Sequence, residues 1–197
     1  MDQGKLIVFS APSGSGKTSI VKHLLKQPEL NLDFSISATS RPQRANELEG
    51  QDYYFLNPEQ FEYHITREEF IEYKEVYTNN YYGTLKNEVK RIWEAGKHVI
   101  FDIDVIGGME IKEKYPNRTL TVFVKPPSLQ EAEKRLRGRK TDTEEKIKER
   151  LEKAEAEMKY EESFDVVLMN DDFETAKKEA CQLVHNFLNL YVDAKPL

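Results

Sequence analysis

The stretch Leu6-Ile7-Val8-Phe9-Ser10-Ala11-Pro12-Ser13-Gly14-Ser15-Gly16-Lys17-Thr18 decides the fold of this chain. Its apolar first part, Leu6–Ser10, has the composition of a buried strand, and a turn rich in glycine and serine follows. The next apolar residues recur with helical spacing and share one face: Ile20, Val21, Leu24 and Leu25. A strand, a tight turn and an amphipathic helix in this order predict the first unit of a parallel α/β sheet.

The turn between this strand and this helix has the composition of a phosphate-binding loop. Gly14 and Gly16 permit backbone conformations closed to other residues, so successive N–H groups can surround an anion. The helix N-terminus adds positive potential, Lys17 adds a cation, and the Thr18 hydroxyl can bind Mg²⁺ that accompanies a nucleotide. Ala11 stands where the pattern G-x-x-x-x-G-K-[ST] has its first glycine, and a methyl group fits there if φ is negative. A plain turn rich in glycine and serine is the alternative interpretation.

Three further apolar runs are predicted as strands of the same sheet. These runs are His98–Ile103, Leu120–Val124 and Val166–Met169. Helical patterns follow them: Ser128 and Glu131 have the spacing of a capping box that opens a helix to about Leu136, and a last helix begins near Asp172. The alternation predicts an α/β fold with a parallel sheet core, and 197 residues suit a single domain.

Composition excludes several classes of protein. Hydrophobic residues make up 39% of the chain, so the mean hydropathy of -0.70 reflects a charged surface and not disorder. A net charge of -6 argues against a non-specific nucleic-acid binder. The single Cys181 excludes an internal disulfide and any all-cysteine metal site. With no apolar run long enough for a membrane span or a signal peptide, we expect a cytoplasmic protein without nucleic-acid or membrane partners.

Residues 34–96 interrupt the alternation of strands and helices. They are rich in Tyr, Phe, Glu and Arg and contain short alternating pieces such as Phe34-Ser35-Ile36-Ser37. We therefore expect small antiparallel strands and short helices, in a lobe inserted into a core of residues 1–33 and 97–197. A helix over Leu85–Ala95 closes this lobe, and Gly96 is placed to end it.

Residues 135–150 form a second irregular segment. A basic loop that contains glycine leads into a long helix, which the sequence Thr141-Asp142-Thr143-Glu144 would cap. On this helix Glu149 and Lys153 have the spacing of an i,i+4 ion pair. A solvated surface element is the simplest interpretation, but so many cations in an acidic chain also suit an anionic ligand.

Two pairs of charged residues complete the candidate site. Asp102 and Asp104 follow the predicted strand His98–Ile103 at the carboxyl edge, where α/β proteins bind ligands. Arg41 and Arg44 lie three residues apart, and arginine suits bidentate phosphate binding. The alternatives are that the aspartates are turn or cap residues and that the arginines are solvated.

The order of these motifs resembles that of the guanylate kinase family over essentially the whole chain. The matching segments are APSGSGKTS, SISATSRPQR, GQDYYF, FIEY, NYYGT, FDID, RLRGRKTDTEEKIKERL and MND. A phosphate loop alone would indicate only a nucleotide-binding superfamily. The Ser-x-x-x-Arg-x-x-Arg segment, Tyr-Tyr-Gly-Thr and the basic segment are far more specific, and the chain is similar to short, stand-alone members.

This resemblance implies a site for two nucleotides. The expected ATP-binding residues are Ser13, Gly14, Ser15, Gly16, Lys17, Thr18, Ser19, Arg139 and Asn170, the last near the adenine. The expected GMP-binding residues are Ser37, Arg41, Arg44, Tyr53, Glu72, Tyr82, Gly83, Thr84, Asp102 and Asp104. Among these, the guanine-recognising positions are Ser37, Glu72, Thr84 and Asp104, and those that grip the phosphate are Arg41, Arg44, Tyr53 and Tyr82. The expected catalytic residues are Lys17, Arg41, Arg135, Arg139 and Arg150.

The implied reaction is transfer of the γ-phosphoryl group of ATP to GMP, and to dGMP, in purine nucleotide metabolism. The implied fold is a P-loop NTPase-type core with a GMP-binding lobe and a mobile lid at about 135–150. Mg²⁺ would be the cofactor, held by Thr18 and, through water, by Asp102. No side-chain nucleophile is expected, because the attacking phosphate oxygen of GMP is already ionised.

Two rival functions stay open at this point. The first is a catalytically weak protein-interaction module of the same fold, which would have a degraded phosphate loop or would lack the arginines. The second is a kinase for another phosphorylated acceptor. Two residues depart from the family pattern: Ile106, where a Gln often follows the aspartates, and Lys140, where Gly is common. The oligomeric state is not indicated.

Overall fold

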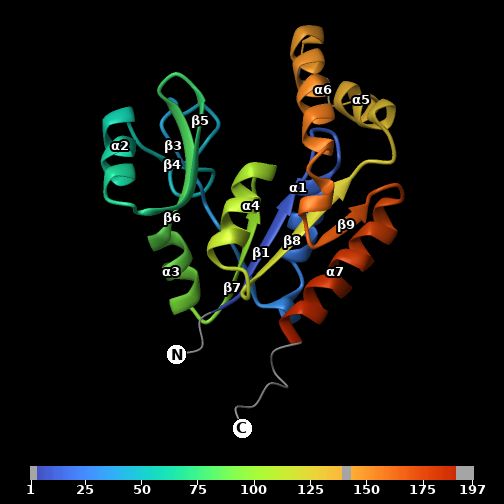
Figure 1. Cartoon of the computed structure of the whole chain (residues 1–197), viewed down its shortest axis with the longest axis horizontal. Coiled ribbons are helices and arrows are strands. Elements are labelled where there is room, and N and C mark those ends of the chain that lie inside the picture. Colours follow the sequence, from blue (N-terminus) through green and yellow to red (C-terminus); the bar gives the residue numbers. More distant parts are fainter. Residues whose placement is uncertain (1–3, 139–142, 190–197) are drawn as a thin grey trace.

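The chain folds around a parallel sheet with strand order β2-β7-β1-β8-β9 (Figure 1). The computed structural model describes residues 4–138 and 143–189. The strands of this sheet are β1 (Leu6–Ser10), β2 (Leu32–Phe34), β7 (His98–Asp102), β8 (Thr119–Lys125) and β9 (Val166–Met169). All neighbouring strands pair in parallel, which confirms the predicted α/β class. Because β1 is central, the loop that follows it lies at the middle of the carboxyl edge.

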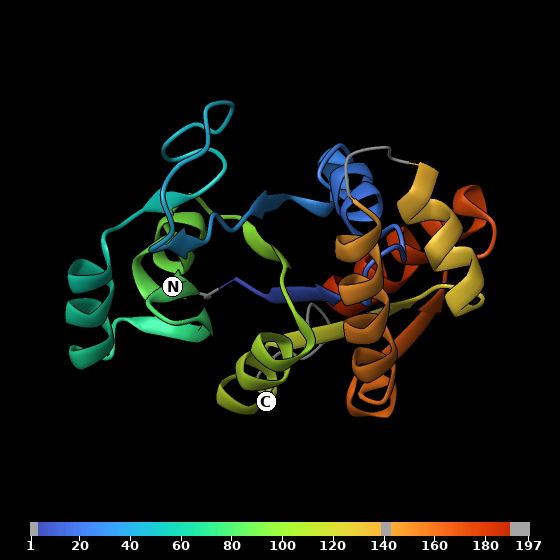
Figure 2. The ribbon, with the colours of Figure 1, turned by 90° about the horizontal axis from the view of Figure 1, so that it is seen from above.

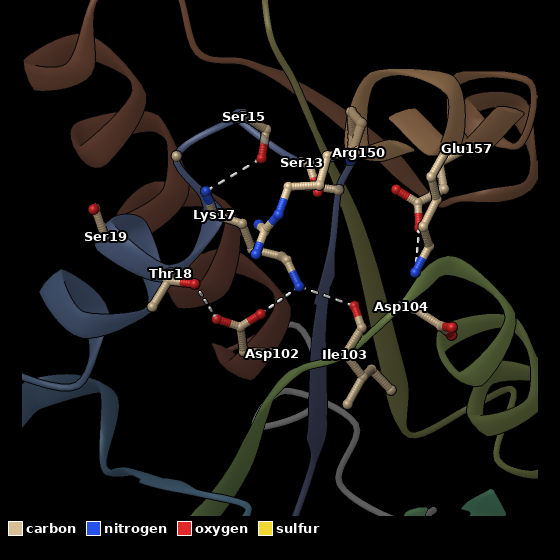
Figure 3. A pocket seen from close by; sticks show the side chains of 15 residues that line it. Ser13, Ser15, Lys17, Thr18, Ser19, Asp102, Ile103, Asp104, Arg150 and Glu157 are labelled. Carbon is tan, nitrogen blue, oxygen red and sulfur yellow. Dashed lines mark hydrogen bonds and ion pairs between the residues drawn. The ribbon is translucent and has the colours of Figure 1, made fainter. Parts of the chain in front are cut away.

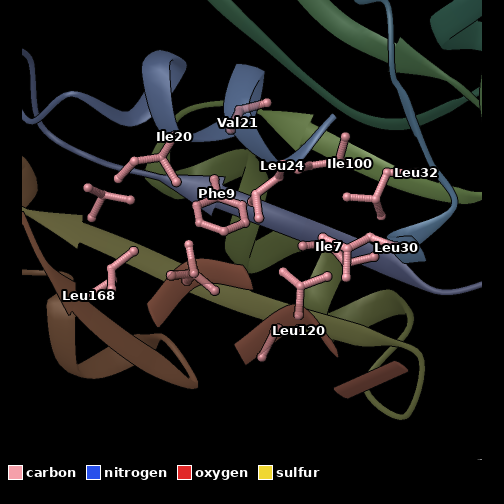
Figure 4. Close-up of a cluster of buried hydrophobic side chains, with 14 of the residues drawn as sticks. Ile7, Phe9, Ile20, Val21, Leu24, Leu30, Leu32, Ile100, Leu120 and Leu168 are labelled. Carbon is pink, nitrogen blue, oxygen red and sulfur yellow. The ribbon is translucent and has the colours of Figure 1, made fainter. Parts of the chain in front are cut away.

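Helices cover both faces of this sheet. The helices on one face are α1 (Lys17–Leu24) and α7 (Phe173–Asn189), and those on the other are α3 (Lys86–Glu94) and α4 (Val105–Lys114). Successive residues of β1 alternate between the two cores. Ile7 and Phe9 pack against α1 and α7 (Figure 4), whereas Leu6 and Val8 pack against α3 and α4. A central strand buried on both faces explains the continuous apolar run in the sequence.

The inserted lobe contains a second sheet with strand order β4-β3-β6-β5 (Figure 2). Its elements are β3 (Ala38–Thr39), β4 (Tyr54–Phe55), α2 (Pro58–Thr66), β5 (Phe70–Tyr77) and β6 (Asn80–Leu85). The pairs β5–β6 and β3–β6 are antiparallel as expected, but β3 and β4 pair in parallel. Phe61 and Phe70 stack with ring centroids 4.3 Å apart in a small core of the lobe.

Two pieces of the span 34–96 lie in the core of the molecule. Phe34 belongs to β2, which pairs with β7 at the edge of the parallel sheet. α3 packs Val89 and Ile92 against β1 and β7, so the helix expected to close the lobe also builds the main core. β2 is too short to show a hydrophobic period in the sequence. It forms a strand because it pairs with β7.

Two paired helices lie near the carboxyl ends of the parallel strands, on the side opposite the lobe (Figure 1). These are α5 (Leu129–Gly138) and α6 (Glu144–Met158). The predicted cap of α5 is confirmed by the Glu131 N–H, which donates to Ser128 Oγ at 3.1 Å. The cap of α6 is Thr143, two residues later than the start of the predicted capping segment. Arg139, Lys140 and Thr141 lie outside the described residues.

Short 3-10 helices span Pro28–Leu30 and Glu161–Ser163. Among the described residues, no helix has both the length and the apolar character needed to cross a membrane. A cytoplasmic location stays a prediction.

Candidate functional site

The loop between β1 and α1 has the backbone conformation of a phosphate-binding loop. Gly14 and Gly16 adopt φ values of +84° and +90°, which only glycine adopts readily. A Cβ on Gly14 would lie 2.5 Å from the carbonyl oxygen of Ala132 on α5. Ala11 is not among the residues with positive φ, so its methyl group is tolerated as the sequence suggested. The loop borders a pocket of about 290 Å³, shown in Figure 3.

Lys17 and Thr18 both contact the carboxylate of Asp102 at the end of β7. Lys17 Nζ forms an ion pair with Asp102 and donates to the carbonyl oxygen of Ile103 at 3.0 Å. Thr18 Oγ1 donates to Asp102 Oδ2 at 2.7 Å (Figure 3). Asp102 therefore lies at the phosphate loop, where its carboxylate contacts the side chains of Lys17 and Thr18. The loop after β1 and the acids at the end of β7, which the sequence predicted as parts of one site, both line this pocket.

Two of these groups, the Thr18 hydroxyl and the Asp102 carboxylate, suit Mg²⁺. A hydroxyl and a carboxylate beside a phosphate loop are hard oxygen ligands, and Mg²⁺ typically takes only one or two such protein groups and completes its shell with phosphate and water. Among residues 4–138 and 143–189, no cluster of three or more His, Cys, Asp and Glu side chains could hold a metal alone. The residues present therefore fit a metal that arrives with a nucleotide, with Thr18 and Asp102 on its protein side.

Glu72 on β5 is a buried carboxyl group. Its side chain is 7% exposed, and Thr84 Oγ1 on the paired strand β6 donates to its Oε1 at 2.7 Å. Burial raises the pKa of Glu72 to about 7, and the Asp104 charge adds to the rise although the Thr84 hydroxyl opposes it. The other oxygen, Oε2, lies against Gly107 of α4, where a Cβ would approach it to 2.8 Å. Gly83 keeps a similar clearance, because its Cβ would meet the Glu72 carbonyl oxygen at 2.7 Å.

Asp104 is the N-cap of α4 and faces Glu72. Its Oδ1 accepts from the Gly107 N–H at 2.9 Å, and Lys74 Nζ on β5 donates to its Oδ2 at 3.2 Å. Burial opposes ionisation of Asp104, but the Gly107 N–H and Lys74 outweigh it and hold the pKa below the usual value. Ile106, which departs from the family pattern, packs against the apolar cluster that contains Val105.

Arg41 is held by three side chains of the lobe. Its Nη1 and Nη2 donate to the two oxygens of Glu47, each at 2.7 Å, and its Nε donates to Tyr82 Oη at 2.9 Å. The guanidinium carbon also lies 5.0 Å from the centre of the Tyr53 ring. The Arg41 guanidinium lowers the pKa of Glu47 to about 2, so this carboxyl group stays ionised.

Arg44 differs from Arg41 in its exposure. Its side chain is 70% exposed, with only a weak contact of 3.9 Å to Glu47. Tyr53 and Ser37 line a cavity of about 570 Å³ that also reaches Thr18 and Asp102. Of the four residues predicted to grip the acceptor phosphate, Arg41, Tyr53 and Tyr82 contact one another on the lobe, and Tyr53 lines the cavity that reaches the start of α1.

Arg135 and Asn170 lie behind the phosphate loop. Asn170 Nδ2 donates to the Ser15 carbonyl oxygen at 2.6 Å, and Arg135 Nη2 donates to the Asn170 carbonyl oxygen at 3.0 Å. Both line a small pocket with Gly16 and Ser19, whereas Arg150 lines the pocket of Lys17. Arg135 is therefore placed differently from Arg150, with which the resemblance groups it. The predicted position Arg139 falls outside the described residues.

Four residues of the site escaped the sequence reasoning. Glu47 and Lys74 bind Arg41 and Asp104, although nothing in their local pattern distinguishes them from other surface charges. Glu157 and Lys153 line the phosphate pocket from α6. Their spacing from Arg150 by three and seven residues is the signal that could have found them, since such residues share a helix face.

Comparison with known proteins agrees with this geometry. The guanylate kinase family profile matches residues 3–187. The guanylate kinase of Bacteroides thetaiotaomicron is 54% identical over 94% of this chain and 91% of its own length, and that of Porphyromonas gingivalis is 50% identical over 93% and 98%. The crystal structure of guanylate kinase from Anaplasma phagocytophilum superposes with a TM-score of 0.71 at 28% identity, over all of this chain and 89% of that one. The chain belongs to the guanylate kinase family.

Proposed function

We propose that the chain transfers the γ-phosphoryl group of ATP to GMP, with Mg²⁺, and so produces ADP and GDP. The observation that carries this proposal is the buried carboxyl group of Glu72 on the lobe. Glu72 lies beside Asp104, and Asp104 lines the pocket of the phosphate loop. Guanine offers two adjacent donors, N1–H and the exocyclic amine, whereas adenine has an acceptor at N1. A carboxylate therefore pairs with guanine and opposes adenine.

Each half of the reaction has its own residues. The backbone of residues 13–19 would hold the phosphates of ATP, and the unpaired Oδ1 of Asn170, buried behind the loop, would accept a hydrogen bond from the adenine amine. Arg41, Arg44, Tyr53 and Tyr82 would hold the phosphate of the acceptor. Base and phosphate are the groups recognised here, so dGMP is proposed as a second acceptor.

Positioning and charge neutralisation would supply the catalysis. When bound, Mg²⁺ would neutralise charge on the donor phosphates, with Thr18 and Asp102 on its protein side. Lys17 would leave its ion pair with Asp102 for the transferring group, and Arg150 faces the same pocket. We further propose that residues 135–150 close over the nucleotides and exclude water, which would otherwise hydrolyse ATP.

The rival function, a protein-interaction module, fits the site less well. It predicts a degraded phosphate loop, yet Gly14, Gly16, Lys17 and Thr18 are present and in the required conformation. An ADP-release assay with ATP and equal concentrations of GMP, dGMP, AMP, UMP and CMP tests the proposal. We expect turnover with GMP and dGMP and little with the others. ADP release that is equal for all acceptors, or absent with every one, would refute it.

A further inference from the structure

Three side chains of α6 face the phosphate pocket. Arg150, Lys153 and Glu157 follow at intervals of three and four residues, so they share one face of the helix. All three line the pocket formed by the phosphate loop and the end of β7. The proposed phosphoryl transfer already uses Arg150, but it gives no role to Lys153 or Glu157.

Glu157 is a buried acid beside a site for polyphosphate. Its side chain is 10% exposed, and Figure 3 shows it on the Asp104 side of the pocket. Burial raises the pKa of Glu157; the charge of Lys153 opposes this rise, Asp104 adds to it, and Lys17 opposes it. A buried carboxylate here would repel phosphate unless a cation stood beside it. Its position therefore needs a partner cation.

Lys153 supplies that cation and remains accessible. Its Nζ lies 3.5 Å from Glu157 Oε1, while its side chain keeps 56% of its exposed area. An ammonium group has three donors, so one can stay on Glu157 while another binds a phosphate oxygen. The charge of Lys153 also contributes to the lowered pKa of Asp104. Lys153 therefore interacts electrostatically with an acid that lines the same pocket.

We propose that Lys153 is a further phosphate-binding residue of the transfer site, and that Glu157 is the positioning residue that holds its ammonium group at the pocket. This proposal rests on the ATP:GMP transfer proposed above. The sequence pattern pairs Lys153 with Glu149, which would direct it away from Glu157. The structure instead pairs it with the acid one turn further along the helix, inside the pocket.

The first test compares Lys153 with a lysine at the end of the same helix. Lys153→Met removes the charge and keeps most of the stem, and Lys159→Met is the matched control, because Lys159 is an exposed lysine at the C-cap of α6, outside residues 135–150. We expect Lys153→Met to lower kcat/KM for ATP at saturating GMP by about tenfold or more, the effect of one charge-assisted hydrogen bond. Lys153→Arg should restore most of it. Lys159→Met should stay within about twofold of wild type, with similar Tm in all variants.

The second test is a double-mutant cycle with Glu157→Gln. If Glu157 acts through Lys153, Glu157→Gln lowers kcat/KM in the wild-type background and changes little in the Lys153→Met background. Wild-type kcat/KM in Lys153→Met would overturn the role of Lys153. An equal effect of Glu157→Gln in both backgrounds would overturn the positioning role.

The failure of this proposal and that of the proposed function are distinguishable. If the wild-type chain releases no ADP with any acceptor, the function fails, and calorimetry of MgATP binding then decides about Lys153. The proposal expects an ATP affinity at least about threefold weaker in Lys153→Met than in Lys159→Met. Equal affinities of these two variants would overturn it.

Discussion

In the proposed reaction, the donor end and the acceptor end of the site would hold phosphate by different means. At the donor end, a glycine-containing loop after the central strand presents backbone N–H groups, and Lys17 forms an ion pair with Asp102. At the acceptor end, side chains of the lobe hold Arg41, whose guanidinium donates two hydrogen bonds to Glu47. The first arrangement is built from backbone on a sheet buried on both faces, and the second from side chains on a small separate sheet.

This difference assigns different tasks to the two ends. Backbone N–H groups bind any phosphate chain and carry no information about the base. The lobe carries Glu72 and Thr84 as well as Arg41, so in the proposed reaction it would recognise both the base and the phosphate of the acceptor. We therefore expect substitutions in the lobe to change selectivity and substitutions at the donor end to have the strongest effects on chemistry.

The largest effect is expected at Lys17. Lys17→Ala removes a cation aimed at charge that develops during transfer, so kcat should fall by about 10²–10³-fold. Because Lys17 lies on a loop at the pocket, Tm should stay within a few degrees of wild type. Lys26→Ala, an exposed lysine just after α1, is the control for steady-state kinetics. An active Lys17→Ala enzyme would remove the phosphate-loop assignment.

A smaller effect is expected at the acceptor clamp. Arg41→Lys keeps the charge but loses the planar fork that contacts Glu47 and Tyr82. GMP affinity measured by calorimetry should weaken by one to two orders of magnitude, the value of about 1.5–3 kcal/mol for a hydrogen bond to a charged group. ATP affinity should change little, since the two ends are separate. Arg67→Lys, another lobe arginine paired with a glutamate, serves as control, and equal losses in both variants would contradict the clamp.

The smallest effect concerns pH. Burial raises the pKa of Glu72 to about 7, so only part of the free protein carries the carboxylate at neutral pH. Guanine donors require the ionised form, and GMP affinity should therefore rise as pH increases through 7, by up to about tenfold between pH 6 and 8. The phosphate of GMP itself titrates near pH 6, so the same titration with Glu72→Gln separates the two groups. Parallel profiles for both proteins would contradict this assignment.

The core could be predicted from sequence because its signals are local. β1 and β9 have the predicted bounds, and both strand-end acids lie where parallel strands place them. The loop glycines and Lys17 also needed only their own spacing. These features depend on residues near one another in the chain.

The remaining features depend on contacts between distant segments. β2 becomes a strand only by pairing with β7, and Lys74 meets Asp104 across 30 positions of sequence. The raised pKa of Glu72 likewise comes from burial against α4, which its local sequence does not encode. For this reason the sequence near Glu72 gives no sign that burial raises its pKa to about 7.

The most direct test of the division between the two ends is the ratio of kcat/KM for GMP to that for AMP, measured in wild type and in Glu72→Gln. A site built around required hydrogen bonds can discriminate by about 10⁴–10⁵. We predict that Glu72→Gln lowers this ratio by at least about tenfold, while Glu75→Gln, an exposed acid on the same strand, leaves it unchanged. A Glu72→Gln protein that folds, turns over GMP and keeps the wild-type ratio would contradict the assignment of base selection to the lobe.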